Sequence, residues 1–221
     1  MQVIAPERAL RCSPLFADLE RDTLEHIAAR CQERRYASRQ RIVTEGDGSG
    51  QVELHIVVSG VVRIFKRSFD GRELVLSLMR RGDTFGEAAV FDGGPYPASA
   101  EAQEPTVVLA LAACEIRNLA RTDPAFSDAC LRLMAGRLRQ MTTMAEDLAL
   151  RRVMSRVSKL LLTDPDAAHL TQAQIAAMVG STREVVNRSL HSLSGCGAIE
   201  LHGQSILVTD PEQLRLIAHT G

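Results

Sequence analysis

The sequence lacks a surplus of positive charge, and it has little lysine. Its 221 residues carry 26 Lys and Arg against 27 Asp and Glu, a formal net charge of −1 at pH 7. Overall charge therefore does not hold this chain to nucleic acid, and any nucleic-acid site must be local. Lys66 and Lys159 are the only lysines, so the other basic residues are arginines, whose planar forks suit phosphates and base edges. We attribute most of these arginines to the codon usage of a GC-rich genome.

Closely spaced cysteine pairs are also missing. The cysteines are five, an odd number, at wide spacings and without a CxxC pair: Cys12, Cys31, Cys114, Cys130 and Cys196. This pattern argues against a disulfide framework and favours reduced thiols in the cytosol.

Long apolar runs are absent as well. Residues 1–8 lack the apolar stretch of a signal peptide, and no later window approaches the roughly 20 apolar residues of a membrane span. We therefore expect a cytoplasmic protein with no membrane partner. Its length and 45% apolar content suffice for one large or two small domains, each with its own core.

The first half of the chain has a β-rich pattern. Residues 10–32 have helical spacing and predict a short helical lead-in, and from Tyr36 short apolar runs alternate with glycine-bearing turns. Asp70-Gly71 is a strong hairpin signal, because both central positions of the expected turn need positive φ. The regular spacing predicts a compact antiparallel barrel or sandwich. The expected strands are residues 41–43, 54–58, 61–65, 73–78 and 107–111.

A long helical segment follows Asp123-Pro124. Six apolar residues at spacings of 3, 4, 3, 4 and 3 form an a/d seam through three heptads: Leu131, Met134, Leu138, Met141, Ala145 and Leu148. The seam fits either a helix packed on its own domain or a helix paired with a second copy. Its polar flanks, and the lack of a second long helix nearby, favour a symmetric dimer.

The last part of the chain contains a helix, a glycine turn and a second helix over residues 170–190. Thr171 and Gln174 have the spacing of a capping box, and Gly180 supplies the turn. Ser181 or Thr182 caps the second helix.

The second helix exposes a polar face made of Arg183, Glu184, Asn187 and Arg188. Arginine forks match guanine O6 and N7, and a glutamate accepts from cytosine N4, so this face suits the major groove of DNA. A hairpin pattern around His202-Gly203-Gln204 predicts a wing after the helix.

The order of β-roll, long helix and winged helix-turn-helix resembles the catabolite activator/fumarate-nitrate regulator (Crp/Fnr) superfamily of bacterial transcription factors. The matching stretches are residues 45–47, 59–62, 70–73, 82–87, Arg156 and 170–190. The resemblance implies an α+β fold with three parts: a cyclic-nucleotide-binding-like jelly roll that senses an effector (1–122), a dimerisation helix (123–150) and a DNA-binding winged helix-turn-helix (151–221). It also implies a homodimer whose partners are a palindromic double-stranded DNA site and RNA polymerase. In the family, the positions that match Arg183, Glu184 and Arg188 contact bases, and those that match Ser181 and Thr182 meet phosphate.

Cyclic-nucleotide members of this family carry a phosphate-binding cassette, in which an arginine and a small hydroxyl residue follow a glycine-glutamate turn and a short helix. The first half is present here, but tyrosine, proline, alanine and serine stand where the arginine and hydroxyl residue are expected. No basic residue lies between Arg81 and Arg117, whereas six acidic residues do. We therefore predict no tight binding of cyclic AMP, although Arg137 or Arg139 offers a cation from the long helix. The candidate effector pocket comprises Gly86, Glu87, Ala88, Tyr96, Pro97, Ala98, Ser99 and Thr142.

Other effectors are tested by their ligand requirements. An iron-sulfur cluster needs four thiolates, which the isolated cysteines do not supply. Haem needs an axial ligand, and His55 and His26 are weak candidates, because a single histidine in a strand is more often a core or surface residue. A redox switch at Cys31, Cys114 or Cys130 stays open.

Three functional alternatives to an effector-controlled DNA-binding regulator remain. The chain is a cyclic-nucleotide- or haem-responsive member of the family, a sensing module whose C-terminal helices contact a protein, or an enzyme. The last is the weakest, because the sequence has no HExxH, no Walker glycine loop with lysine and no paired nucleophile and base.

Overall fold

The computed structural model describes residues 5–48, 52–203 and 205–219. They fall into two compact units, one within Met1–Lys66 and Leu76–Leu138, the other within Arg67–Val75 and Arg139–Gly221. Residues 1–4, and Gln204 of the predicted wing turn, lie outside the described residues.

The expected helical lead-in is two short helices rather than one. Helix α1 spans Pro6–Arg11 and helix α2 spans Arg21–Ala28. Leu15 and Phe16 in the break between them are buried in the same core as the helices. The apolar spacing correctly predicted that this segment packs on the core. It did not show that the chain turns between two separate helices.

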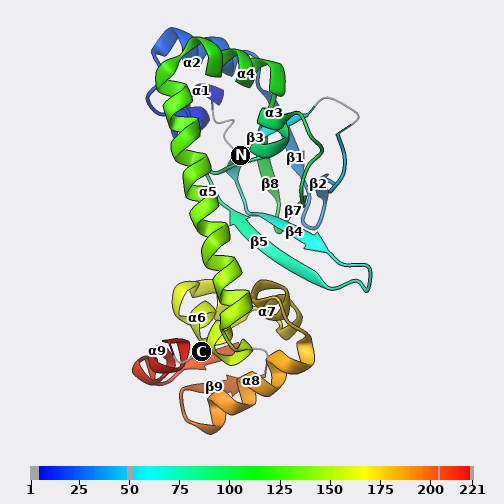
Figure 1. Cartoon of the computed structure of the whole chain (residues 1–221), viewed down its shortest axis with the longest axis vertical. Helices are drawn as coiled ribbons and strands as arrows, with labels where there is room; N and C mark the ends of the chain where they lie inside the picture. The colour runs from blue at the N-terminus through cyan, green and yellow to red at the C-terminus, as the bar shows by residue number, and fades with distance from the viewer. Residues whose placement is uncertain (1–4, 49–51, 204, 220–221) are drawn as a thin grey trace. The chain divides into compact units, whose positions relative to one another are not determined.

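Within the described part of residues 32–112, eight strands form two antiparallel sheets (Figure 1). The strands are β1 (Gln32–Tyr36), β2 (Arg41–Val43), β3 (Glu53–Ser59), β4 (Val62–Arg67), β5 (Glu73–Met79), β6 (Thr84–Phe85), β7 (Ser99–Ala102) and β8 (Thr106–Ala112). The strand orders are β1-β8-β3-β6 and β2-β7-β4-β5. The predicted β-roll is thus confirmed, although β1, β6 and β7 were not expected as strands.

Strand β3 separates two cores, because successive side chains of a strand point to opposite faces. Leu54 and Ile56 pack with the helices of the first unit. Val57 packs with Phe85 and Val108 in a second cluster that draws on both sheets. The interior of the roll is therefore the face that carries the odd-numbered residues of β3.

The hairpin between β4 and β5 has a different turn from the one expected. Gly71 has a φ of 82°, but Asp70 is not among the described residues with positive φ. Ser68 N donates to Arg72 O at 2.9 Å, which closes a three-residue loop. The prediction of two left-handed residues was wrong, because a three-residue loop needs only its last residue in that region.

Helices complete the first unit. Helix α3 (Glu87–Asp92) follows the glycine-glutamate turn, and helix α4 (Ala113–Thr122), which was not predicted, follows β8. Helix α5 runs unbroken over Pro124–Leu150 (Figure 1). It starts there because Asp123 Oδ1 accepts from Phe126 N at 3.0 Å and Pro124 has no N–H to satisfy.

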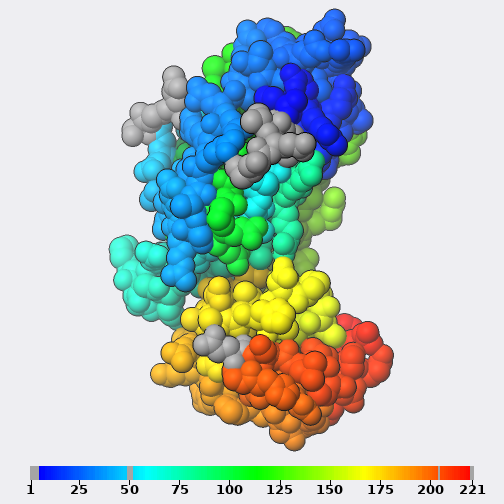
Figure 2. Space-filling view, turned by 180° about the vertical axis from the view of Figure 1, so that it is seen from behind, coloured from blue at the N-terminus to red at the C-terminus, as the bar shows by residue number. Residues whose placement is uncertain are grey.

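The second unit is a small α+β fold. Its elements are α6 (Val153–Thr163), the 3₁₀ helix η1 (Pro165–His169), α7 (Gln172–Val179), α8 (Arg183–Gly195), β9 (Ile199–His202), β10 (Ser205–Val208) and α9 (Pro211–His219). Strands β9 and β10 pair antiparallel as the predicted wing. The unexpected helix α9, red in Figure 2, lies at the surface of this unit and buries Leu214 and Ala218.

Candidate functional site

The turn between α7 and α8 is built as the sequence predicted. Thr171 Oγ1 accepts from Gln174 N, and the Gln174 side chain accepts from Thr171 N, which completes a capping box at the start of α7. Gly180 ends α7 in the left-handed region, with a φ of 63°. Thr182 rather than Ser181 caps α8, because its side chain accepts from Val185 N.

Helix α8 has a buried face and an exposed polar face. Val186, Leu190 and Leu193 are buried in the core of the second unit. At 100° per residue, Arg183, Glu184, Asn187 and Arg188 fall within an arc of about 140° on another side. The side chains of Arg183, Glu184 and Arg188 are exposed. Nothing in the described ranges engages these three side chains in a hydrogen bond or ion pair. This face offers two guanidinium groups and one carboxylate to an external partner.

Asn187 differs from its neighbours on this face. It is half-buried, and its Nδ2 donates to Gln172 Oε1 at 3.1 Å. This bond ties the middle of α8 to the first turn of α7. The structure therefore gives Asn187 a positioning contact between the two helices, which its place on the helical wheel did not reveal.

A hollow of about 500 Å³ opens beside this face of the second unit. It lies between the start of α7, the start of α8 and the wing. Leu170, Ile175 and Leu190 contribute apolar lining, and Thr171 and Arg183 contribute polar lining. Arg183 thus borders both the exposed face of α8 and the wing.

The seam of α5 is largely exposed on the single chain. Leu131 and Leu138 are 69% and 70% exposed, and Met141, Ala145 and Leu148 are also exposed, whereas Met134 is half-buried. An amphipathic helix packed on its own domain buries its apolar stripe. Leu148 has a further contact, because a Cβ at Gly180 would lie 2.6 Å from its Cδ2.

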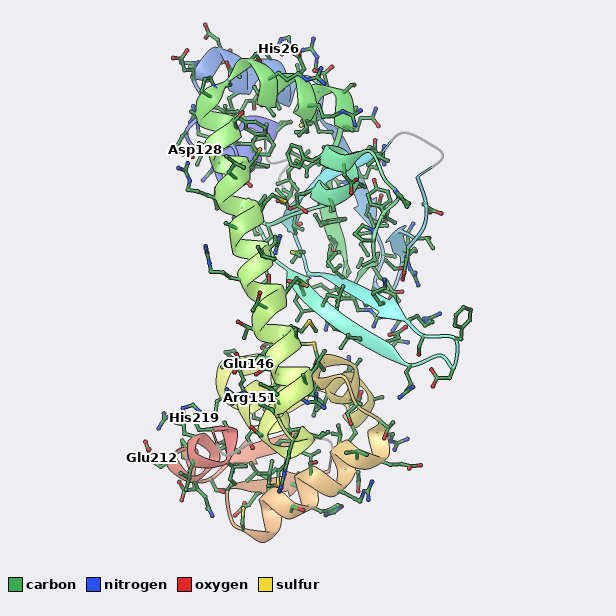
Figure 3. All side chains as sticks on the ribbon, in the orientation of Figure 1. His26, Asp128, Glu146, Arg151, Glu212 and His219 are labelled. Carbon is green, nitrogen blue, oxygen red and sulfur yellow. The ribbon has the colours of Figure 1, made fainter. Side chains whose placement is uncertain are left out.

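The end of α5 is fixed by charged side chains of the second unit. Arg151 Nε lies 2.8 Å from Asp147 Oδ1, and Lys159 Nζ lies 2.5 Å from Asp147 Oδ2. Arg151 Nη1 also donates to Ala218 O at 2.6 Å, which joins the end of α5 to α9. Figure 3 labels Arg151 and Glu146 beside the end of α5 and His219 on α9.

The candidate effector pocket starts at Gly86, whose φ is 95°. A Cβ at this position would lie 2.6 Å from Glu53 O of β3, so only glycine fits the close approach. Glu87 is buried, and its Oε1 accepts from Thr84 Oγ1. Arg137 Nη2 of α5 lies 3.7 Å from the same oxygen and donates to Thr84 O at 2.8 Å. The cation expected from the long helix therefore reaches the glycine-glutamate turn, and Glu87 neutralises it.

The rest of the candidate pocket is bonded within the protein. The Tyr96 hydroxyl bonds to the backbone of Glu53, and Ser99 Oγ accepts from Glu45 N at 3.0 Å. Ala98 is buried, whereas Ala88 and Pro97 are exposed. Thr142 belongs to the stretch of α5 assigned to the second unit.

A cyclic nucleotide needs a cation against its phosphate and free acceptors for its ribose. The cassette itself supplies no cation, because Pro97 and Ala98 are uncharged, and one carboxylate oxygen of Glu87, Oε1, already accepts from Thr84 Oγ1. The residues present do not fit this group.

His55 is buried and is not placed to ligate haem iron. The ring is 1% exposed and stacks on Phe85 with 4.7 Å between ring centroids. Burial, reinforced by the charge of Arg34, lowers the pKa of His55 to about 3, so the ring is neutral at pH 7. His26 is exposed on α2.

Of the three candidate redox cysteines, Cys130 is buried and Cys31 is half-buried. Burial raises the pKa of Cys31 to about 12 and that of Cys130 to about 11. Cys114 is exposed. Across the described ranges, His, Cys, Asp and Glu nowhere gather in a group of three or more able to hold a metal ion.

One charged pair of the roll was not predicted from the sequence. Arg34 on β1 holds Glu53 on β3 through two hydrogen bonds of 2.6 Å, and strand β8 lies between them in the sheet. Neither residue belongs to a recognisable motif. The only sequence signal for this pair is the alternation of side chains between the two faces of β1 and β3. Once the strand register is known, this alternation places both Arg34 and Glu53 on the interior face.

Comparisons with known proteins agree with this architecture. Residues 33–123 match the cyclic nucleotide-binding domain, and residues 148–217 match the Crp-like helix-turn-helix domain. The CRP-like cAMP-activated global transcriptional regulator of Mycobacterium tuberculosis is 32% identical over 212 residues, which cover 90% of this chain and 94% of the relative. The cyclic AMP receptor protein of Thermus thermophilus is 32% identical over 214 residues, 95% of this chain and 98% of the relative.

A solved structure shows the same fold. The c-di-GMP responsive global regulator CLP of Xanthomonas campestris superposes with a TM-score of 0.75 at 25% identity, over 86% of this chain and 99% of the other. A β-roll domain followed by a long helix and a winged helix-turn-helix is the architecture of Crp-like transcription regulators. This chain belongs to the Crp/Fnr superfamily of DNA-binding transcription regulators. None of the helices in the described ranges combines the length and apolarity that crossing a bilayer requires.

Proposed function

We propose that the protein is a homodimeric, sequence-specific regulator of transcription that reads DNA with α8. The observation that carries the proposal is the exposed face of this helix, where Arg183, Glu184 and Arg188 stand outward opposite a buried apolar face. The alternative is an ordinary helical hairpin whose charged face contacts only solvent, and that arrangement does not require a wing. Here the wing and the hollow beside Arg183 complete a surface that accepts a duplex.

The residue types predict which bases are read. The two arginines bind guanine O6 and N7 in the major groove, and Glu184 accepts from the amino group of cytosine. The start of α8, with Ser181 and Thr182, meets the phosphate backbone, because a helix N-terminus attracts anions. Each half-site therefore contains G·C pairs at the positions that face these three residues.

The exposed seam of α5 supports a dimer. Two copies of the helix bury Leu131 and Leu138 against each other. Two-fold symmetry then presents two α8 helices to half-sites about one DNA turn apart, which matches a palindromic operator.

The effector proposed for the roll is not cyclic AMP, although the names of two relatives include that nucleotide. The chain lacks the cassette arginine, and the nearby cation, Arg137, is paired with Glu87. RNA polymerase is proposed as the protein partner at promoters, and co-sedimentation of the DNA complex with the holoenzyme tests this.

Selection of bound duplexes from a random-sequence library tests the proposal. We expect a palindromic G·C-containing consensus for the wild-type protein. The double variant Arg183→Ala/Arg188→Ala is expected to lose discrimination among sequences while its thermal unfolding stays unchanged, because both side chains are exposed.

The control is Arg8→Ala/Arg121→Ala, which removes the same charge from two exposed positions away from α8. It is expected to keep the wild-type consensus and the wild-type dependence of affinity on salt concentration. An unchanged consensus in the α8 variant contradicts base reading by α8. Failure of the wild-type protein to retain any duplex contradicts DNA binding itself.

A further inference from the structure

The hydroxyl of Tyr96 joins the end of the cassette to the backbone of β3 by hydrogen bonds. It accepts from Glu53 N at 2.9 Å and donates to Glu53 O at 3.1 Å. The same carbonyl oxygen faces Gly86, where a Cβ would lie 2.6 Å from it. Both ends of the cassette, residues 86 and 96, therefore meet the backbone of one residue of β3, Glu53.

The side chain of Glu53 extends this contact across the sheet. Its two carboxylate oxygens accept from Arg34 Nη1 and Nη2 at 2.6 Å each. The Glu53 side chain is 15% exposed. A bidentate arginine-carboxylate pair of this kind fixes the relative orientation of the two side chains as well as pairing their charges. Arg34, Glu53 and Tyr96 thus form one bonded set, here called the tyrosine clamp, which joins β1, β3 and the cassette.

His55 adds packing to the clamp but no charge. Its ring lies between Phe85, with 4.7 Å between centroids, and Tyr96, with 6.5 Å between centroids. Its Nε2 is 3.8 Å from Glu53 Oε2, and the low pKa of the buried ring keeps this contact from being an ion pair at pH 7. Tyr96 is therefore held by its ring and by its hydroxyl.

The remaining polar groups of the cassette also have partners within the protein. Glu87 is bonded by Thr84 and faces Arg137, and Ser99 is bonded by Glu45 N. Arg137 belongs to α5, so the cassette is already joined to the long helix. These are the groups through which a bound nucleotide would act.

We propose that the tyrosine clamp takes the place of a phosphate ligand, so that the protein binds its DNA site without a cyclic nucleotide. The inference rests on the proposed DNA-binding function. A ligand shifts a conformational equilibrium only through contacts that differ between the two states. A nucleotide entering this cassette must first break the internal hydrogen bonds, and each buried group left unbonded opposes its entry.

The test measures DNA affinity by fluorescence anisotropy with a duplex taken from the selection experiment, with and without cyclic AMP or cyclic GMP at millimolar concentration. The wild-type protein is expected to give the same dissociation constant in all conditions. Tyr96→Phe, which keeps the ring and removes the hydroxyl, is expected to weaken DNA binding about tenfold, a typical coupling between distant sites. Faster hydrogen exchange at the Glu53 amide is expected to accompany this loss.

Thr106→Val is the matched control. It also deletes one buried hydroxyl from the roll, since Thr106 Oγ1 donates to Glu104 O at 2.8 Å, but Thr106 has no bond to the clamp. Its DNA affinity is expected to equal that of the wild type. An equal loss in both variants overturns the clamp, because general loosening of the roll would then suffice.

Two other results overturn the inference: a wild-type protein that needs cyclic nucleotide to bind its site, and a folded Tyr96→Phe variant with wild-type affinity. If Tyr96→Phe does not fold, Arg34→Gln, which leaves the tyrosine in place, is measured instead, and unchanged affinity again overturns the clamp. No binding of the wild type under any condition is a different failure, since it removes the proposed DNA-binding function.

Discussion

His55 makes stability depend on pH at the scale of one residue. Its pKa in the folded protein is lowered to about 3, first by burial and then by the charge of Arg34, from an ordinary value of 6.5. Between these values the unfolded chain binds a proton that the folded protein does not. Acid therefore favours unfolding across this window, and the group has no further effect below pH 3.

We predict that lowering the pH from 7 to 5 reduces the free energy of unfolding by about 2 kcal/mol through this residue. Urea unfolding at a series of pH values measures the effect. His55→Phe keeps an aromatic ring against Phe85 and does not titrate, so this variant is expected to lose that part of the pH dependence. The same slope in both proteins would show that other groups cause it.

The cysteines differ in exposure, and this predicts their reactivity. Cys12, Cys114 and Cys196 are exposed, whereas burial raises the pKa of Cys31 to about 12 and that of Cys130 to about 11. The thiolate is the reactive form. Iodoacetamide at pH 7 is expected to modify the first three and spare Cys31 and Cys130, as peptide mass spectrometry will show. Modification of all five at equal rates in folded protein would contradict the burial.

Residue roles could be predicted where they follow from local periodicity. The outward face with Arg183 and Arg188 comes from the 3.6-residue repeat, and the cap at Thr182 comes from a hydroxyl before a helix. The pair of Arg34 and Glu53 could not be predicted, because it depends on the register of β1 and β3 with β8. Asn187 was predicted to be exposed with its neighbours, but it is half-buried and donates to Gln172 of the preceding helix.

At the scale of elements, the apolar patterns predicted the central strands β3, β4 and β8 but not the edge strands β1 and β6. Strand β1 has the sequence QERRY and is an edge strand, so little in it alternates between apolar and polar residues. Strand β6 has two residues, too few for a period. Helix α9 was missed because Leu214 and Ala218 are its only buried residues. The helices and strands that build the proposed DNA interface were all found, since caps and turns mark their ends.

The turn between α7 and α8 depends on Gly180. We predict that Gly180→Ala destabilises the protein by about 2 kcal/mol, because an alanine in the left-handed region costs about 1–2 kcal/mol. A Cβ there would also lie 2.6 Å from Leu148 Cδ2. Urea unfolding of the purified variants measures the change.

Gly195→Ala is the control for this substitution. Gly195 lies in α8, and a Cβ built on it meets no atom within 4 Å. The variant is expected to be as stable as the wild type or more stable by up to about 1 kcal/mol, from helix propensity alone. Equal losses in the two variants would contradict a special conformation at Gly180.

At the scale of the whole molecule, the two units share no core cluster, and one long helix contributes to both units. The cluster around Ile56 and Phe126 and the cluster around Ile175 and Leu190 have no residue in common. Each unit therefore buries its own apolar side chains, and in the proposed dimer pairing along α5 would link two DNA-binding units. Sequence analysis predicted this helix from its heptads, and the exposure of the seam supports pairing rather than packing on its own domain.

The proposed dimer leads to a prediction about molecular mass and DNA affinity. Leu131→Glu/Leu138→Glu is expected to convert the protein to a monomer in light-scattering chromatography. Burying one leucine stabilises an interface by about 1.5–3 kcal/mol, and two-fold symmetry doubles each loss. The control Phe69→Glu/Leu216→Glu changes two exposed apolar residues that lie outside both α5 and the wing, and it should remain dimeric. The monomer should also bind a palindromic duplex far more weakly than the control, because linking two half-sites raises the effective concentration of the second. A dimeric mass for the α5 variant, or a monomeric mass for the control, would place the interface elsewhere.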